Sequence, residues 1–273
     1  MLPKDLEQDE QKRLRRARTF DEIPELYDRA RRPFPDQFFD DLFAQSGIEP
    51  AGARVLEIGC GTGQMTLPLA RRGCRIVCVE LGANLARFTQ QKLAQFPDFR
   101  IVVARFEDWG PDESSFDMVF SARSWHWLDP QVRCAKCAAL LRPRGVLAFT
   151  TGGHALSPDA DPFFAQIQDC YESIGEARMK WPPPRPEDIP DLRPEIEQSG
   201  LFEGIVVLRY LWAEEFTAEQ YVAMMSTASD HRIMEPEKRD SLFAEMRRLI
   251  NARPDGRIRL HALTILHIAH RKS

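Results

Sequence analysis

The strongest chemical signature in the sequence is a short apolar run that leads straight into a glycine-rich turn. The run is Val55-Leu56-Glu57-Ile58, and the turn is Gly59-Cys60-Gly61-Thr62-Gly63. Glycines allow a sharp turn and a close approach of the backbone to a ligand, and a following helix offers unpaired N–H groups at its N-terminus. The pattern therefore predicts a strand, a ligand-binding turn and a helix.

The spacing of these glycines separates two classes of cofactor. The dinucleotide fingerprint G-x-G-x-x-G requires a glycine at position 64, but that residue is Gln64, and the third glycine falls one position earlier at Gly63. An NAD(P)-dependent oxidoreductase is therefore disfavoured and stays as the alternative enzyme class. The alternative outside catalysis is a non-catalytic cofactor-binding module.

One histidine has the chemistry of a catalytic residue. His126 lies between Trp125 and Trp127, shortly after the fourth apolar run. An imidazole titrates near neutral pH, as a general base does, so His126 is the candidate catalytic residue. The alternative is a histidine packed between two tryptophans in the core.

The cysteines and the remaining histidines do not predict a metal site. Cys134 and Cys137 have C-x-x-C spacing, but no second cysteine pair or Cys/His pair follows at the spacing of a zinc site. The histidines towards the C-terminus also lack ligand spacing: His231, His261, His267 and His270.

The elements that position these residues follow from the apolar pattern between residues 54 and 151. Five β-rich runs alternate with amphipathic stretches, and their continuous apolarity is typical of strands covered on both faces of a parallel sheet. The predicted strands contain residues 55–58, 76–79, 101–103, 117–120 and 146–149, and the predicted helices span 65–71, 85–96 and 131–141. The pattern predicts an α/β, doubly wound, Rossmann-like fold.

The alternation ends after Thr151. Helices are predicted over 162–176, 192–198, 218–226 and 235–251, and strands over 204–212 and 258–269. Aromatic residues near a proline-rich connection suggest an apolar cavity for a small molecule: Phe163, Phe164, Tyr171 and Trp181. We divide the chain into an N-terminal helical segment (1–47), a cofactor-binding core (48–151) and a region of helical lid insertions with the last strands (152–273).

Composition excludes several functions. Lysine and arginine total 37 against 41 acidic residues, a net charge of −4, which disfavours nucleic-acid binding. No apolar run is long enough to cross a membrane, and the first twenty residues are too charged for a secretory signal. We expect a cytoplasmic protein without nucleic-acid or membrane partners, and the oligomeric state stays open.

The glycine-rich segment resembles motif I of the class I S-adenosylmethionine-dependent methyltransferases, E/D-x-G-x-G-x-G. Three further landmarks follow in the family's order: Glu80 ends the second run, Asp117 opens the fourth, and Leu140-Leu141-Arg142-Pro143-Arg144-Gly145 precedes the fifth as the family's L-x-P-G-G turn does. The resemblance implies a seven-stranded sheet whose last strand is antiparallel.

The resemblance also implies the cofactor, S-adenosylmethionine, and its contacts. Glu80 would accept both ribose hydroxyls, as an acceptor-only side chain can. The implied cofactor-binding residues are Tyr27, Arg31, Glu57, Gly59, Cys60, Gly61, Gly63, Glu80, Leu81, Phe106, Glu107 and Ser121. One residue departs from the pattern: Arg105 stands where many relatives have an aspartate that accepts from the adenine amino group, and an arginine cannot accept.

A second resemblance covers Tyr27-Asp28-Arg29-Ala30-Arg31-Arg32-Pro33-Phe34-Pro35, which is similar to the Y-x-x-x-R-P-x-Y-P segment of the trans-aconitate methyltransferase-like group. It implies that the N-terminal segment closes over the cofactor, with Tyr27 bounding the methyl-donor pocket. Arg31 or Arg32 would approach the cofactor's carboxylate or an acidic acceptor. The implied reaction is methyl transfer to a small-molecule acceptor, with a carboxylate as one candidate.

Overall fold

The computed structural model describes residues 4–110, 115–176 and 182–273. The chain divides into two units. Unit 1 consists of Met1–Thr151, Asp191–Leu208 and Ile265–Ser273, and unit 2 consists of Gly152–Pro190 and Arg209–Thr264. Trp181, one of the aromatic residues noted above, lies outside the described residues.

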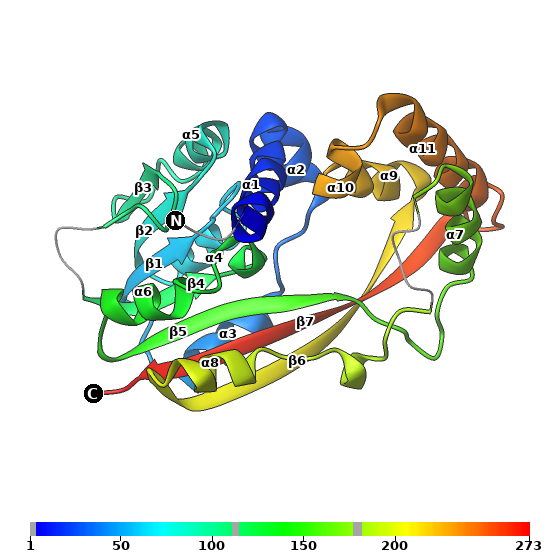
Figure 1. The fold of residues 1–273 in the computed structure, drawn as a ribbon. Coiled ribbons are helices and arrows are strands. Elements are labelled where there is room, and N and C mark those ends of the chain that lie inside the picture. The colour runs from blue at the N-terminus through cyan, green and yellow to red at the C-terminus, as the bar shows by residue number, and fades with distance from the viewer. Residues whose placement is uncertain (1–3, 111–114, 177–181) are drawn as a thin grey trace. The chain divides into compact units, whose positions relative to one another are not determined.

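Seven strands form one sheet in the order β3-β2-β1-β4-β5-β7-β6 (Figure 1). They are β1 (Arg54–Ile58), β2 (Arg75–Glu80), β3 (Phe99–Val103), β4 (Phe116–Ser121), β5 (Leu141–His154), β6 (Phe202–Thr217) and β7 (Arg257–Arg271). β1 pairs in parallel with β2 and β4, β2 with β3, and β4 with β5, whereas β7 is antiparallel. The predicted fold class and the antiparallel last strand are confirmed.

The strand order fixes where a ligand site is expected. β2 and β3 lie on one side of β1, whereas β4 and β5 lie on the other, so the chain reverses direction across the sheet between β1 and β4. Open α/β sheets bind ligands beyond the carboxyl ends of their strands at such a switch point. The turn after β1 and the loop after β4 therefore lie at the expected site.

In unit 1, some helices precede the first strand in the chain, and others connect the parallel strands. The helices of this unit are α1 (Lys4–Arg18), η1 (Thr19–Glu22), α2 (Pro24–Ala30), α3 (Asp36–Ser46), α4 (Thr66–Arg71), α5 (Ala83–Lys92), η2 (Trp125–Trp127), α6 (Arg133–Leu140) and α8 (Arg193–Ser199). α5 ends four residues before the predicted Phe96. Pro97 follows Phe96 and disfavours helical backbone at the residue before it, which explains the earlier end.

The turn predicted before the fifth strand is instead part of β5. Leu141 pairs with Phe116 and Val146 with Met118, so residues 142–145 bulge opposite Asp117. Arg142 Nε forms an ion pair with Asp117 Oδ1 at 2.5 Å, and Arg144 takes the left-handed conformation with φ 62°. The sequence showed the change of direction, but not that strand pairing resumes on both sides of it.

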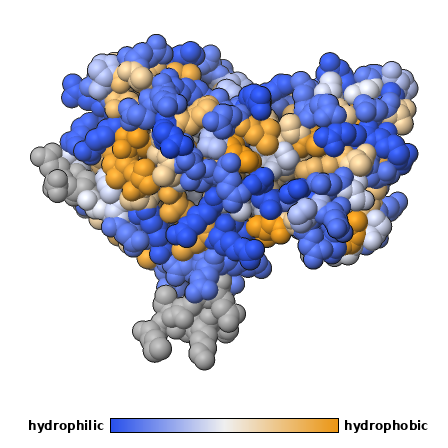
Figure 2. Space-filling view, turned by 90° about the horizontal axis from the view of Figure 1, so that it is seen from above, coloured by the Kyte–Doolittle hydropathy of each residue, from blue (hydrophilic) through white to orange (hydrophobic). Residues whose placement is uncertain are grey.

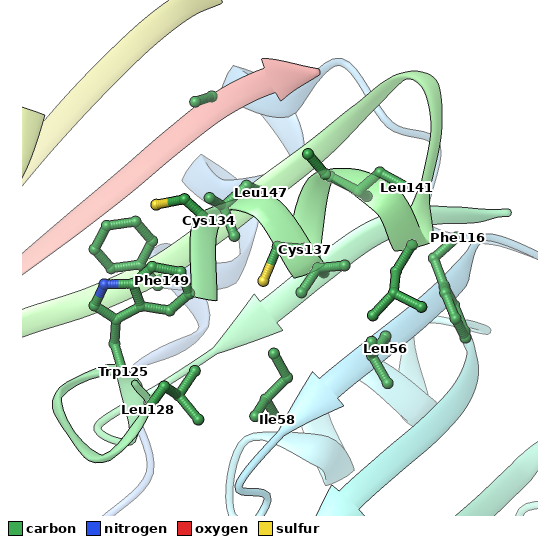
Figure 3. Close-up of a cluster of buried hydrophobic side chains, with 14 of the residues drawn as sticks. Leu56, Ile58, Phe116, Trp125, Leu128, Cys134, Cys137, Leu141, Leu147 and Phe149 are labelled. Carbon is green, nitrogen blue, oxygen red and sulfur yellow. The ribbon is translucent and has the colours of Figure 1, made fainter. Parts of the chain in front are cut away.

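The core of unit 1 packs α6 against the sheet (Figure 3). Trp125 stacks on Phe149, with ring centroids 4.1 Å apart. Cys134 and Cys137 of α6 are buried in this cluster, and their sulfur atoms point in different directions (Figure 3). Burial raises the pKa of Cys134 to about 12, so both cysteines behave as small apolar residues here.

Unit 2 has a core of its own. Its helices are α7 (Phe163–Ser173), η3 (Pro186–Asp188), α9 (Ala218–Ser226), α10 (Ser229–Arg232) and α11 (Pro236–Asn251). Phe163, Phe164 and Tyr171 of α7 are buried in this core with Tyr221 of α9. The aromatic residues that suggested a cavity in the sequence therefore pack mainly among themselves. Whether unit 2 acts as a lid stays a prediction.

The surface in Figure 2 is mostly hydrophilic, and its apolar residues gather in several separate patches. Among the described residues, no helix combines the length and the apolarity that spanning a membrane requires.

Candidate functional site

A pocket in unit 1 lies at the predicted switch point. Its wall is built from the end of β1 and the glycine turn, the end of β2, the loops after β3 and β4, and the N-terminal helices. The lining residues include Leu14, Ala17, Phe20, Tyr27, Glu57, Gly59, Cys60, Gly61, Thr62, Gln64, Glu80, Leu81, Arg105, Phe106, Glu107, Arg123, Ser124, Trp127 and Leu128.

The three glycines of the turn have different reasons to be glycine. All three have positive φ. A Cβ at Gly59 would lie 2.7 Å from Ser124 Cβ, and one at Gly63 would lie 2.8 Å from Leu93 Cδ1, so these two positions are required by packing. A Cβ at Gly61 would meet nothing within 4 Å. Gly61 therefore leaves open space along the pocket wall, where a ligand can approach the backbone.

Thr62, at the tip of the same turn, has an unsatisfied polar atom. Its side chain is 1% exposed. The hydroxyl Oγ1 has no hydrogen-bond partner among the described residues. A buried hydroxyl without a partner costs free energy, and Thr62 lines the pocket, so a polar ligand group there would remove the cost.

Glu80 holds the glycine turn from the neighbouring strand. Its Oε2 accepts from the N–H of Gly61 at 2.9 Å, and its Oε1 accepts from the N–H of Gly82 at 3.0 Å. Each carboxylate oxygen can accept more than one hydrogen bond, so the side chain keeps acceptor capacity for a ligand hydroxyl. Burial raises the pKa of Glu80, against the effect of the backbone N–H donors.

Glu57 is a second buried carboxyl in the pocket wall, with 1% of its surface exposed. Burial raises its pKa to about 7, while hydrogen bonds from Thr66 and Cys78 lower it and the charge of Glu80 raises it further. The Cys78 thiol lies 3.7 Å from Glu57 Oε2. A positively charged group of a ligand would favour the ionised form of these two carboxyl groups.

The N-terminal segment is fastened to both ends of helix α5. Asp21 Oδ1 accepts from the backbone N–H groups of Asn84 at 2.7 Å and Leu85 at 2.8 Å. At the other end, Lys92 Nζ donates to Asp28 Oδ1 at 2.7 Å. A Cβ at Gly82 would lie 2.4 Å from Asp21 Oδ1, so the glycine admits the approach of this carboxylate.

Gln64, the residue that breaks the dinucleotide pattern, also binds the N-terminal segment. Its Nε2 donates to the carbonyl oxygens of Arg31 at 2.5 Å and Asp28 at 3.1 Å. Arg31 and Tyr27 belong to this segment, and the Arg31 guanidinium lies over the Tyr27 ring at 5.9 Å. The glycine turn thus holds α2 beside the pocket, and Tyr27 lines it.

Arg105 fastens helix α1 to the pocket. Its Nη2 forms an ion pair with Glu10 Oε1, and its Nε donates to Glu107 Oε2 at 3.2 Å. Glu107 Oε1 in turn accepts from the backbone N–H of Asp129 at 2.8 Å. This explains the departure seen in the sequence: the residue in place of an adenine acceptor ties down α1, whose Leu14 and Ala17 line the pocket.

The loop after β4 presents Ser124 to the pocket. Ser124 Oγ donates to the carbonyl of Ile58 at 2.6 Å, and Ser121 Oγ lies behind it at 2.8 Å. Arg123 has φ 58°, and its guanidinium lies over Phe34 at 4.4 Å and donates to the carbonyl of Arg32. This loop therefore also contacts the N-terminal segment.

His126 lies in the same loop but is exposed. Neighbouring protein atoms partly desolvate its ring, and this lowers its pKa most. The positive charges of Arg133 and Arg16 lower it further, to about 4. The imidazole is therefore neutral at physiological pH. Its ring lies 4.5 Å from that of Trp127.

The structure brings most of the predicted site residues together. Those that line the pocket are Tyr27, Glu57, Gly59, Cys60, Gly61, Glu80, Leu81, Phe106 and Glu107. Four lie outside the lining: Arg31, Gly63, Ser121 and His126. Gly63 and Ser121 support the wall from behind, Arg31 lies beyond Tyr27, and His126 lies beyond Trp127. Sequence reasoning missed Leu14, Ala17 and Phe20, because nothing in a charge-dense opening segment marks them.

Comparison with known proteins agrees with this geometry. Residues 56–149 match the family described as Methyltransferase domain. Over 169 residues the chain is 32% identical to an uncharacterized methyltransferase of Mycobacterium tuberculosis, a match that covers 57% of this chain and 66% of that protein. Over 135 residues it is 32% identical to a malonyl-acyl-carrier-protein O-methyltransferase of Geobacter sulfurreducens, covering 48% of this chain and 47% of the relative. The chain thus spans less than two thirds of the length of these relatives.

A solved structure shows the same fold. The phosphoethanolamine N-methyltransferase 2 of Haemonchus contortus, in complex with phosphomonomethylethanolamine and S-adenosylhomocysteine, aligns with a TM-score of 0.55 at 16% identity. The alignment covers 93% of this chain and 58% of that one. Residues 56–149 thus match a methyltransferase domain, and the chain has the Rossmann-like fold of its solved methyltransferase neighbours.

Proposed function

We propose that this chain transfers a methyl group from S-adenosylmethionine to a small-molecule acceptor. The observation that carries the proposal is the pairing of Glu80 with the open glycine turn. The carboxylate holds the N–H of Gly61 and keeps acceptor capacity, while Gly61 leaves free space beside it. A ribose diol and an adjoining chain fit that combination of an acceptor pair and an unobstructed backbone.

The remaining residues fit the other parts of the cofactor. The unsatisfied hydroxyl of Thr62 offers a hydrogen bond to a polar group at the turn. Leu81 and Phe106 offer apolar surface for a base beside Glu80, and Ala122 to Ser124 line the side beyond β4, where the methionine end is expected. When bound, the cofactor supplies an electrophilic methyl group. The chain's own residues bind, orient and exclude water, which is how positioning accelerates a displacement.

We further propose a carboxylate as the acceptor. The trans-aconitate-like segment of residues 27–35 and the O-methyltransferase relative support this class. An ionised carboxylate is already nucleophilic, so its methylation needs no general base. The position of His126 outside the pocket lining agrees with a reaction that relies on position.

Calorimetric titration tests the cofactor assignment. S-adenosylhomocysteine and S-adenosylmethionine should both bind and raise the melting temperature, because a ligand confined to the native state stabilises it. NADP should do neither. Heat with NADP and none with S-adenosylhomocysteine would replace the methyltransferase by an oxidoreductase. Binding of S-adenosylhomocysteine without methyl transfer to carboxylates, phenols or amines would favour a non-catalytic cofactor-binding module.

A further inference from the structure

The amino ends of the parallel strands in unit 1 carry a series of arginines. β1 and β2 begin at Arg54 and Arg75, and Arg100 is the second residue of β3. Two more, Arg142 and Arg144, lie in the bulge near the start of β5. The pocket lies beyond the carboxyl ends of these strands, so the arginines lie at the opposite edge of the sheet. In a chain whose net charge is −4, this edge concentrates positive charge.

Two of these positions cost folding free energy. Arg54 and Arg75 are direct partners in the β1–β2 ladder, and like charges opposite each other on neighbouring strands are destabilising. Arg144 has φ 62°, a left-handed conformation that strains a residue with a Cβ and suits glycine. The family turn that this segment resembles has a glycine at that position. Folding alone does not account for the arginines at positions 75 and 144, which points to a role outside the fold.

Two of the five arginines are occupied within the chain. Arg54 Nη1 donates to Ser115 Oγ at 2.7 Å, and the guanidinium of Arg142 pairs with the carboxylate of Asp117. Both contacts hold the start of β4, so these two arginines serve the sheet itself.

The other three side chains, Arg75, Arg100 and Arg144, are exposed. None of them forms an ion pair with any residue within 4–110, 115–176 and 182–273, and this includes the nearby exposed carboxylate of Asp98. We call Arg75, Arg100 and Arg144 the arginine row. Each offers a planar fork of N–H donors that matches the geometry of a carboxylate.

The spacing of the arginine row fits an extended chain. Arg100 is the ladder partner of Val77, and Val77 points to the same face of β2 as Arg75. Arg75 and Arg100 therefore extend from one face of adjacent strands. Arg144 lies three strands from Arg75 in the order β2-β1-β4-β5, about 14 Å at the usual strand separation of about 4.8 Å. Carboxylates at alternate positions of an extended segment lie about 7 Å apart, so about five residues span this distance.

We propose that the arginine row is a docking surface for an extended, acidic segment of a partner protein. Three exposed cations on a chain of net charge −4 suit a short acidic segment better than a nucleic acid, because a long polyanion would also meet the acidic remainder of the surface. Docking at this edge leaves the pocket at the other edge open, so the partner would not compete with ligands of the pocket. The inference does not rest on the proposed function.

Fluorescence anisotropy on the full chain tests the surface. The probe is a short labelled peptide with glutamate at alternate positions, and a matched probe has glutamine at the same positions. The variants are the double substitution Arg75→Gln with Arg100→Gln, and the single substitution Arg144→Gly. The control variant, Arg185→Gln with Arg257→Gln, removes two exposed positive charges from unit 2.

The wild-type chain should bind the glutamate peptide more tightly than the glutamine peptide, and added salt should weaken this binding because exposed charges are screened. The double variant should lose about 2- to 30-fold in affinity for the glutamate peptide, and Arg144→Gly about 1.5- to 5-fold, the ranges of two and of one exposed ion pair. The control variant should bind it as the wild type does. Affinity for S-adenosylhomocysteine should not change in any variant, because the pocket lies at the other edge.

Stability should change in the opposite direction. Arg75→Gln removes a contact between like charges and Arg144→Gly removes backbone strain, so each should raise the midpoint of urea unfolding. Loss of peptide binding by a chain that has become more stable is not a folding defect. A lower midpoint in both variants would show that these arginines serve the fold, and would overturn the inference.

Equal binding of the two peptides by the wild-type chain would also overturn it, and this comparison does not require any variant to fold. So would a glutamate peptide that binds all the variants equally. Single-stranded RNA or vesicles of anionic lipid that bind more tightly than the peptide, with the same loss in the double variant, would replace the protein partner by another class and overturn the proposal.

Discussion

The carboxylate of Asp21 caps helix α5 through Asn84, which lies 63 positions later in the chain. Asp21 Oδ1 accepts from the Asn84 backbone N–H at 2.7 Å, and Asn84 Nδ2 donates to the Asp21 carbonyl at 3.1 Å. The helix therefore has no cap of its own and depends on the N-terminal segment for one. Because α5 begins at Ala83, directly after Gly82, this contact also fixes the pocket wall near Glu80.

Asp21→Ala should lower the free energy of unfolding by about 0.5–2 kcal/mol, the usual effect of removing a helix cap. It should also weaken the binding of S-adenosylhomocysteine, because the end of the pocket becomes less rigid. Urea unfolding and calorimetry measure the two effects. Asp21→Asn retains an acceptor oxygen, so it should lose less stability and less affinity for S-adenosylhomocysteine than Asp21→Ala. Unchanged stability in the alanine variant would mean that water replaces the cap at no cost.

Glu80→Ala should weaken S-adenosylhomocysteine tens-fold or more, because a carboxylate with two partners contributes on the order of 2–3 kcal/mol. The variant should stay folded, although the N–H groups of Gly61 and Gly82 lose their acceptor. Calorimetric titration alongside a thermal melt separates the two effects. Glu80→Gln keeps one acceptor oxygen, so its affinity for S-adenosylhomocysteine should lie between those of the wild type and of Glu80→Ala. Affinity equal to that of the wild type would show that the second strand is misaligned with the family.

Glu57 should make the chain less stable as the pH rises. Its pKa is raised from 4.5 to about 7 by burial, so between these values the native state binds a proton that the unfolded state has released. The free energy of unfolding should therefore fall through this window, by up to about 3 kcal/mol, and level off above it. Urea unfolding at pH values from 4.5 to 8 measures the free energy of unfolding of the wild type and of Glu57→Gln, and the difference between the two is compared across the pH range. A difference that does not change with pH would contradict the raised pKa.

Breaking the pair between Arg105 and Glu10 should speed cofactor exchange more than it lowers stability. Both side chains are 26% exposed, so the pair contributes no more than about 1 kcal/mol to folding. Arg105→Gln and Glu10→Gln should each raise the association and dissociation rates of S-adenosylhomocysteine in stopped-flow experiments. The charge swap Glu10→Arg with Arg105→Glu should restore slower exchange. Rates that are equal in all four proteins would leave α1 without a role in exchange.

His126→Ala should keep kcat within about tenfold of the wild type, less than the 10²–10⁴ of a true acid–base group. Its pKa of about 4 also means that its titration cannot shape the rate between pH 6 and 8.

Arg31→Ala or Arg32→Ala should chiefly raise KM for an acidic acceptor. Steady-state methyl transfer over carboxylates, phenols and amines measures both. A large loss of kcat in His126→Ala, with neutral acceptors preferred, would refute the carboxylate proposal.

The sequence predicts the sheet well because buried parallel strands have an unmistakable composition. Runs such as residues 55–58 and 76–79 are continuous and apolar, and each became a strand within a residue or two of its predicted ends. The bulge at residues 142–145 could not be predicted, because its pairing depends on Asp117, which is distant in the sequence. Local turn chemistry does not reveal such a partner.

The pocket shows the same division. Glu57, Glu80 and the glycines are recognisable from a local pattern, whereas Phe20 and Leu14 are not. The N-terminal segment has few apolar residues, and its attachment relies on charged and polar contacts with partners far along the chain. Arg105 was visible only as a departure from a pattern. Its role required Glu10, 95 positions earlier.

The attachment of the N-terminal segment has a consequence for the order in which the chain folds. Glu10, Arg13 and Asp21 find their partners 95, 115 and 63 positions later. These residues leave the ribosome before their partners do, and they cannot dock until β1 to β4 and helix α5 have formed the surfaces that receive them. Contacts at such separations form late, because a long loop must close before they contribute. The N-terminal segment should therefore reach its native position only after the later partners have folded, and the pocket of a nascent chain should stay open until then.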